Sequence, residues 1–242
     1  MKKIIMMFLM MVGLMAHASS ADYNVRDYGA KGDGKALDHH AINAAIDSCV
    51  AHGGGRVVVP AGTYLCGSIR MKSHVELHLT AGAKILAAPA KMKAYDEAES
   101  WEGPAYQDGG HTYFKNSLIY AIGQEHVSVT GRGMIDGQGL TKKDTEKGGV
   151  VNGGNIGTGD KAIAFKLCRN ILIRDVTIYR GGHFAIILTG CELGTVDNVT
   201  IDTNRDGFDI DCCKYLSISN CKINTPRDDA LVLKSSYALK KP

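Results

Sequence analysis

The chain has 242 residues, 45% of them hydrophobic, and a formal net charge of +3 at pH 7. This length suits one large domain or two ordinary ones, and the apolar content is enough for a packed core. The small positive charge excludes the strongly basic face of a nucleic-acid-binding protein. With 29 glycines and only 5 prolines, the composition is typical of many short strands joined by tight turns.

The first 18 residues have the features of a secretory signal peptide. Two lysines at 2–3 precede an apolar run at 4–16 that is too short to span a bilayer. The small-x-small sequence at 16–18 predicts cleavage after Ala18. We therefore expect an exported, periplasmic or extracellular protein with no membrane span, whose residues 19–242 form the catalytic domain.

The next elements in chain order are a strand, a helix and several short strands. Residues 23–35 alternate apolar with polar side chains and then enter a Gly/Asp turn, which predicts a strand and a loop. Residues 38–52 carry apolar side chains at helical spacing and end at three glycines, which predicts a short amphipathic helix. Further strands are predicted at 56–60, 67–71, 75–79, 84–87, 117–121 and 126–130. Residues 88–116 and 136–160 have the composition of long loops.

A repeat becomes visible after residue 166. The segments that begin at Cys168, Cys191 and Cys213 can be superimposed with offsets of 23 and 22 residues. Each contains short β segments and no helix, which predicts a parallel β-helix. A leucine-rich repeat has a similar period, but its Leu-x-x-Leu-x-Leu-x-x-Asn pattern is absent.

Equivalent positions of successive coils stack about 4.8 Å apart in such a fold. We expect Cys168, Cys191 and Cys213 to form an interior ladder, in which a disulfide between neighbours is geometrically possible. The chain holds seven cysteines, so at least one is unpaired within it, and none has zinc-site spacing. No metal site is therefore predicted from the cysteines.

A second ladder is predicted fifteen residues after each of these cysteines. Counting places His183, Asp206 and Asp228 there, with Asp229 beside the last. Because stacked carboxylates repel each other, a fold that brings them together bears a cost, and such arrangements indicate function.

Two short motifs around these aspartates carry a family resemblance. Asn-Arg-Asp-Gly-Phe-Asp at 204–209 and Arg-Asp-Asp-Ala at 227–230 resemble motifs of glycoside hydrolase family 28, the polygalacturonases and rhamnogalacturonan hydrolases. The segments at 25–34 and 54–64 resemble the family's N-terminal cap and first coil. The resemblance implies an all-β fold, a right-handed parallel β-helix with a short N-terminal capping helix.

The resemblance also implies roles for individual residues. Asp228 matches the general acid, Asp206 and Asp229 match the carboxylates that hold and activate water, and Asn204 supports them. Inverting glycosidases need no cofactor and leave about 6.5–9.5 Å between the acid and base carboxyl groups, which is room for the attacking water. We therefore expect a monomeric, inverting polygalacturonase-like hydrolase that acts on galacturonate-containing pectic polysaccharide or oligosaccharide.

Five residues are candidates for substrate binding. Arg205 and Arg227 replace the family's Thr and Gly and are expected to alter substrate preference. Lys234 is a candidate contact for a substrate carboxylate. Asn204, two residues before Asp206, and His183, one coil before Asp206, are the remaining candidates.

Two other functions are compatible with the same sequence features. One is a calcium-dependent, pectate-lyase-like β-helix, although Asp206, Asp209 and Asp211 lack the pattern and distal Glu of an EF-hand loop. The other is a non-catalytic carbohydrate-binding β-helix. The family's Gly-His-Gly and Arg-x-Lys motifs belong to later coils and are not found before Pro242, so we expect the domain to be C-terminally incomplete.

Overall fold

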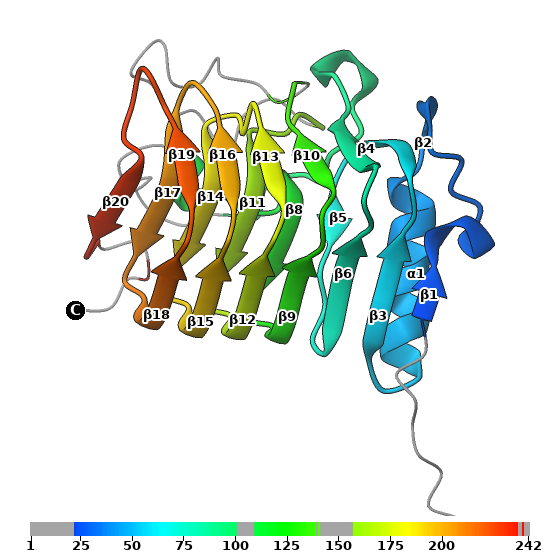
Figure 1. Cartoon of the computed structure of the whole chain (residues 1–242), viewed down its shortest axis with the longest axis horizontal. Helices are drawn as coiled ribbons and strands as arrows, with labels where there is room; N and C mark the ends of the chain where they lie inside the picture. Colours follow the sequence, from blue (N-terminus) through cyan, green and yellow to red (C-terminus); the bar gives the residue numbers. More distant parts are fainter. Residues whose placement is uncertain (1–21, 101–108, 139, 141–156, 237–238, 240–242) are drawn as a thin grey trace, which may run out of the picture.

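The computed structural model describes residues 22–100, 109–138, 140, 157–236 and 239. Within them, 20 short strands wind into coils and stack as three parallel sheets (Figure 1). This is the predicted right-handed parallel β-helix. The expected signal peptide lies outside the described residues. Among those residues, no helix combines the length and the hydrophobicity needed to cross a membrane.

A helix caps the N-terminal end of the solenoid, as predicted. It is α1 (His39–Ala51), and it lies beside β1 (Asp22–Asn24) and β3 (Gly55–Val59) at the end of the stack in Figure 1. Its buried residues Ile42, Ala45, Ile46 and Cys49 recur at helical spacing and close the first coil. The short elements η1 (Val25–Tyr28) and β2 (Asp33–Leu37) complete the cap.

The three sheets run along the solenoid, and we name them A, B and C. Besides β1 and β3, sheet A contains β6 (Val75–Leu79), β9 (Glu125–Thr130), β12 (Arg169–Arg174), β15 (Glu192–Asp197) and β18 (Lys214–Ser219). Besides β2, sheet B contains β4 (Gly62–Cys66), β7 (Ala83–Ala87), β10 (Met134–Asp136), β13 (Thr177–Tyr179), β16 (Thr200–Asp202) and β19 (Lys222–Asn224). Sheet C contains β5 (Ile69–Arg70), β8 (Ser117–Ile122), β11 (Lys161–Lys166), β14 (Phe184–Thr189), β17 (Asp206–Asp211) and β20 (Leu231–Lys234).

Alternate side chains of sheets A and B point into the core, whereas sheet C is buried on both faces in its middle. In β6, for example, Val75, Leu77 and Leu79 are fully buried and the residues between them are partly exposed. All residues of β14 and β17 are buried. The reason is a second apolar cluster on the outer face of sheet C, formed by Phe114, Ala164, Phe184 and Ile187. The segment that holds α2 (Gly109–Thr112) therefore packs against this sheet.

The predicted interior cysteine ladder is confirmed. Arg169 pairs with Glu192 and Glu192 with Lys214, so Cys168, Cys191 and Cys213 occupy equivalent positions. Cys168 and Cys191 are buried, and Cys213 packs against the core. All seven cysteines are free thiols in the structure.

Four strands escaped the prediction. They are β2, β4, β10 and β11, which lie in or beside glycine-rich stretches. The strand predicted at 67–71 is reduced to the two residues of β5. The segment 88–100 is irregular as expected, apart from η2 (Ala90–Met92). Neighbouring coils hold β4, β10 and β11 in place, because each of these three pairs on both sides with a parallel partner.

Candidate active site

The three aspartates singled out by their motifs meet at the edge between sheets B and C. Asp206 is the first residue of β17, and Asp228 and Asp229 lie in the turn between β19 and β20. One carboxylate oxygen from each lies within 4.8 Å of those of the other two. Asp206 is buried, whereas Asp228 and Asp229 are exposed. The cluster thus has one member fixed in the protein and two that face solvent.

The predicted order of this ladder is wrong by one residue. Asp206 pairs with Phe184 and not with His183, and the pairing of Phe208 with Leu231 places Asp229 beside Asp206. The cause is the length of the turns that lead from sheet B to sheet C. The turn before β14 spans residues 180–183, but the turn before β17 spans only 203–205. A constant count of fifteen residues therefore slips by one position.

Burial and the neighbouring carboxylate change the protonation of Asp206. Burial, followed by a hydrogen bond and charge repulsion from Asp228, raises the pKa of Asp206 to about 7. The charge of Arg205 and a backbone hydrogen bond at Asp229 oppose this rise. Arg205 also pairs with Asp228, with 3.1 Å between Nε and Oδ2. Near neutral pH the cluster therefore holds a proton that an isolated aspartate would have lost.

Asp206→Asn is expected to remove a pH dependence of stability. A carboxyl group with a raised pKa in the folded state destabilises that state as pH rises from its unfolded pKa near 4 to about 7. Between pH 4 and 8 the free energy of unfolding of the variant should fall less than that of the wild type, by about 3–4 kcal/mol. Urea unfolding across this pH range measures the difference.

Asp175→Asn is the matched control for that experiment. Asp175 is a partly exposed aspartate that accepts a hydrogen bond from Asn198 on the outside of the solenoid. Its substitution makes the same chemical change away from the cluster. Parallel stability curves for Asp206→Asn and the wild type would contradict the raised pKa.

The predicted substrate-binding residues are not all at the surface of this cluster. Asn204 and Arg227 are exposed, and Arg205 is half-buried against Asp228. Asn204 also lines a cavity of about 330 Å³, together with Tyr179 and Arg180. His183 is buried, and its ring packs on Phe184 with a centroid distance of 4.2 Å. Of these residues, Asn204 and Arg227 are accessible at the surface and His183 is not.

Lys234 belongs to a buried charge cluster that the sequence did not indicate. Its Nζ lies 2.8 Å from Asp209 Oδ2 and 2.6 Å from His111 Nε2, and His111 Nε2 lies 3.1 Å from the same oxygen. Although burial opposes ionisation of Asp209, the hydrogen bonds from His111 and Lys234 lower its pKa. The cluster fastens α2 to β17 and β20, immediately beside the aspartates.

The aspartates lie close enough to share a cation or a water molecule. One oxygen of each lies within 4.8 Å of the others. Because Asp228 and Asp229 are exposed, their side chains can rotate away from Asp206 without breaking the core. The all-oxygen set is also of the kind that binds calcium.

The stacked three-sheet coils place the chain among the right-handed parallel β-helix proteins. Residues 23–229 match the family described as rhamnogalacturonase A/epimerase, pectate lyase-like. The chain belongs to this family.

Relatives and solved structures support the resemblance to glycoside hydrolase family 28. The chain is 26% identical over 221 residues to an exopolygalacturonase of Platanus acerifolia, covering 87% of this chain and 52% of that protein. It is 33% identical over 136 residues to an exo-poly-alpha-D-galacturonosidase of Dickeya chrysanthemi. That match covers 53% of this chain and 21% of that protein. The crystal structure of a hyperthermoactive exopolygalacturonase from Thermotoga maritima superimposes with a TM-score of 0.75 at 26% identity, covering 89% of this chain and 55% of that one. The chain thus spans about half the length of the plant enzyme.

Proposed function

We propose that the protein to which this chain belongs is an exported inverting glycoside hydrolase that cleaves galacturonate-containing pectic polysaccharide. The galacturonan-cleaving relatives and the acidic cluster of Asp206, Asp228 and Asp229 support this proposal. The aspartates act without a cofactor. All three aspartates come from one chain, and we propose that the protein acts as a monomer.

The chemistry requires one proton donor and one group that activates water. Asp228 is exposed and donates the proton to the leaving glycosidic oxygen, and the buried Asp206 holds the proton shared with it. Asp229 orients and deprotonates the water that attacks the anomeric carbon. Asp206 assists Asp229 in this step once it has lost its own proton. Because the protons of the set are coupled, its apparent pKa values belong to the group and not to one residue.

The single observation that carries this proposal is the cluster of one buried and two exposed carboxylates, and the raised pKa of Asp206 beside Asp228 supports it. General acid catalysis is most effective when the pKa of the acid lies near the working pH. Asp228 can serve as the acid because it shares the proton that Asp206 retains near that pH, whereas an isolated surface aspartate has no such partner. Asn204 and Arg227 are exposed and adjoin Arg205 and Asp228 in the chain, and we propose that they hold the sugar's hydroxyl and carboxylate groups.

Product analysis on polygalacturonate tests the proposal. Incubation of the full-length protein should release new reducing ends, and proton NMR of the first products should show inversion at the anomeric carbon. Products with retained configuration would contradict the inverting mechanism. Binding of pectin without new reducing ends would instead indicate a carbohydrate-binding protein.

A calcium-dependent, lyase-like reaction is the second candidate. The cluster supplies three carboxylates within reach of one cation, and the family's description includes pectate lyase-like proteins. Elimination would give unsaturated products that absorb ultraviolet light, and a chelator would stop their release. Reducing ends that form at the same rate in the presence of a chelator would rule out this candidate.

Arg205→Thr is expected to shift the pH dependence of hydrolysis. The guanidinium favours the ionised form of the carboxylates, and its removal should move both limbs of the pH–activity curve to higher pH by about 0.5–1 pH unit. Arg205→Lys, which keeps the charge, should shift the curve less. A curve unchanged by Arg205→Thr would show that this pair does not control the proton.

A further inference from the structure

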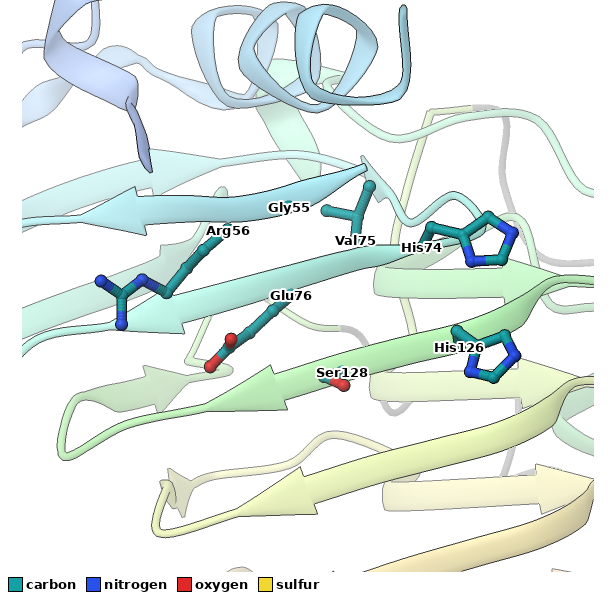
Figure 2. A pocket seen from close by; sticks show the side chains of 7 residues that line it. All are labelled: Gly55, Arg56, His74, Val75, Glu76, His126 and Ser128. Carbon is teal, nitrogen blue, oxygen red and sulfur yellow. The ribbon is translucent and has the colours of Figure 1, made fainter. Parts of the chain in front are cut away.

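A polar site lies on the outer face of sheet A, at the start of β6 and β9 (Figure 2). Seven residues line a cavity of about 460 Å³ there, including His74, His126, Glu76 and Arg56. The aspartate cluster is on another edge of the solenoid, between sheets B and C. The proposed hydrolysis makes no use of this cavity.

The two histidines occupy equivalent positions of neighbouring coils. Glu76 pairs with Ser128, so the register places His74 opposite His126. Both residues have left-handed backbone conformations, with φ of 63° and 52°. Their rings stack with a centroid distance of 5.2 Å and an angle of 20° between planes. Figure 2 shows the two side chains next to each other at the ends of their strands. Two imidazoles are therefore held side by side at the surface.

A carboxylate completes this group. His74 Nε2 lies 3.7 Å from Glu125 Oε1, and the backbone N–H of His74 donates to the carbonyl of Glu125 at 3.0 Å. The side chains of His74 and Glu125 are 53% and 55% exposed, so both can change rotamer at little cost. Arg56 adds no free positive charge to the cavity, because it makes two hydrogen bonds to Asp22 at 2.8 and 2.7 Å.

We propose that His74, His126 and Glu125 bind one divalent transition-metal ion such as nickel or zinc. Imidazole nitrogens suit these metals, whereas calcium and magnesium require oxygen ligands such as those of the aspartate cluster. Binding at metal–nitrogen distances of about 2.0–2.1 Å requires the two rings to turn their nitrogens towards a common point. The exposure of the histidines and of Glu125 permits that movement, in which His126 Nε2 gives up its 3.3 Å contact with Asn170 Nδ2. The register keeps the two histidines on neighbouring strands.

Nickel titration of the untagged full-length protein tests this site. Ni²⁺ is the chosen probe because, unlike Cu²⁺, it does not oxidise the free thiols, and because it favours imidazole. Isothermal titration should show one site, and His74→Asn or His126→Asn should weaken it at least about tenfold. Asparagine tolerates the left-handed backbone, so both variants retain the turn. Glu125→Gln should also weaken binding and leaves the backbone untouched.

Two controls separate this site from the rest of the protein. His40→Gln changes an exposed histidine of α1, and Asp206→Asn changes the aspartate cluster. Both should bind nickel as tightly as the wild type. No nickel binding by the wild type, or equal affinity in all histidine variants, would overturn the proposal. Circular dichroism checks that each variant is folded.

Discussion

Asp228→Asn is expected to lower kcat for polygalacturonate hydrolysis by about 10²–10⁴-fold. The amide has nearly the same shape but cannot donate a proton with the ease of a carboxylic acid. Asp228 is exposed, and its ion pair with the half-buried Arg205 lies outside the core. The fold should therefore survive the change. The measurement is the rate of reducing-end release by the full-length protein over a range of pH.

Asp175→Asn serves again as the control, since it alters a partly exposed aspartate on the outside of the solenoid. It should keep wild-type activity. Activity of Asp228→Asn near that of the wild type would contradict the assignment of Asp228 as the general acid. A substrate with a very good leaving group provides a further check, because its cleavage needs less proton donation and should recover more of the lost rate.

Asp209→Asn is expected to destabilise the protein by about 3–5 kcal/mol. Asp209 is fully buried, and its Oδ2 lies within 3.1 Å of both His111 Nε2 and Lys234 Nζ. Neutralising the carboxylate leaves a cationic group in a protein interior without its counter-charge. Chemical unfolding at neutral pH, followed by circular dichroism, measures the loss.

A second substitution distinguishes the lost charge pair from a packing defect. Lys234→Gln in the Asp209→Asn background removes the unpaired cation and should restore part of the stability. If the loss of unfolding free energy in the double variant equals the sum of the losses in Asp209→Asn and Lys234→Gln, the two side chains do not interact. Because α2 is fastened here, the single variant should also loosen protection of the 109–116 amides from hydrogen exchange.

The sequence by itself determined the coil and its acidic edge. Offsets of 23 and 22 residues between cysteines predicted the stacking of Cys168, Cys191 and Cys213, and the helical spacing of apolar residues predicted α1. Both features are periodic along the chain. The coil repeats its segments every 22 or 23 residues, and a helix returns to the same face every three to four. The two Asp motifs likewise predicted which carboxylates would meet.

Only the tertiary structure decided the details that set the chemistry. A three-residue turn moved Phe184, and not His183, opposite Asp206, which the average coil period could not reveal. His111 reaches Asp209 across 98 positions of the chain, and no motif marks that contact. Such contacts depend on loops whose paths are fixed by packing against sheet C. The burial that raises the pKa of Asp206 arises in the same way, because a carboxylate's environment is made by neighbours distant in sequence.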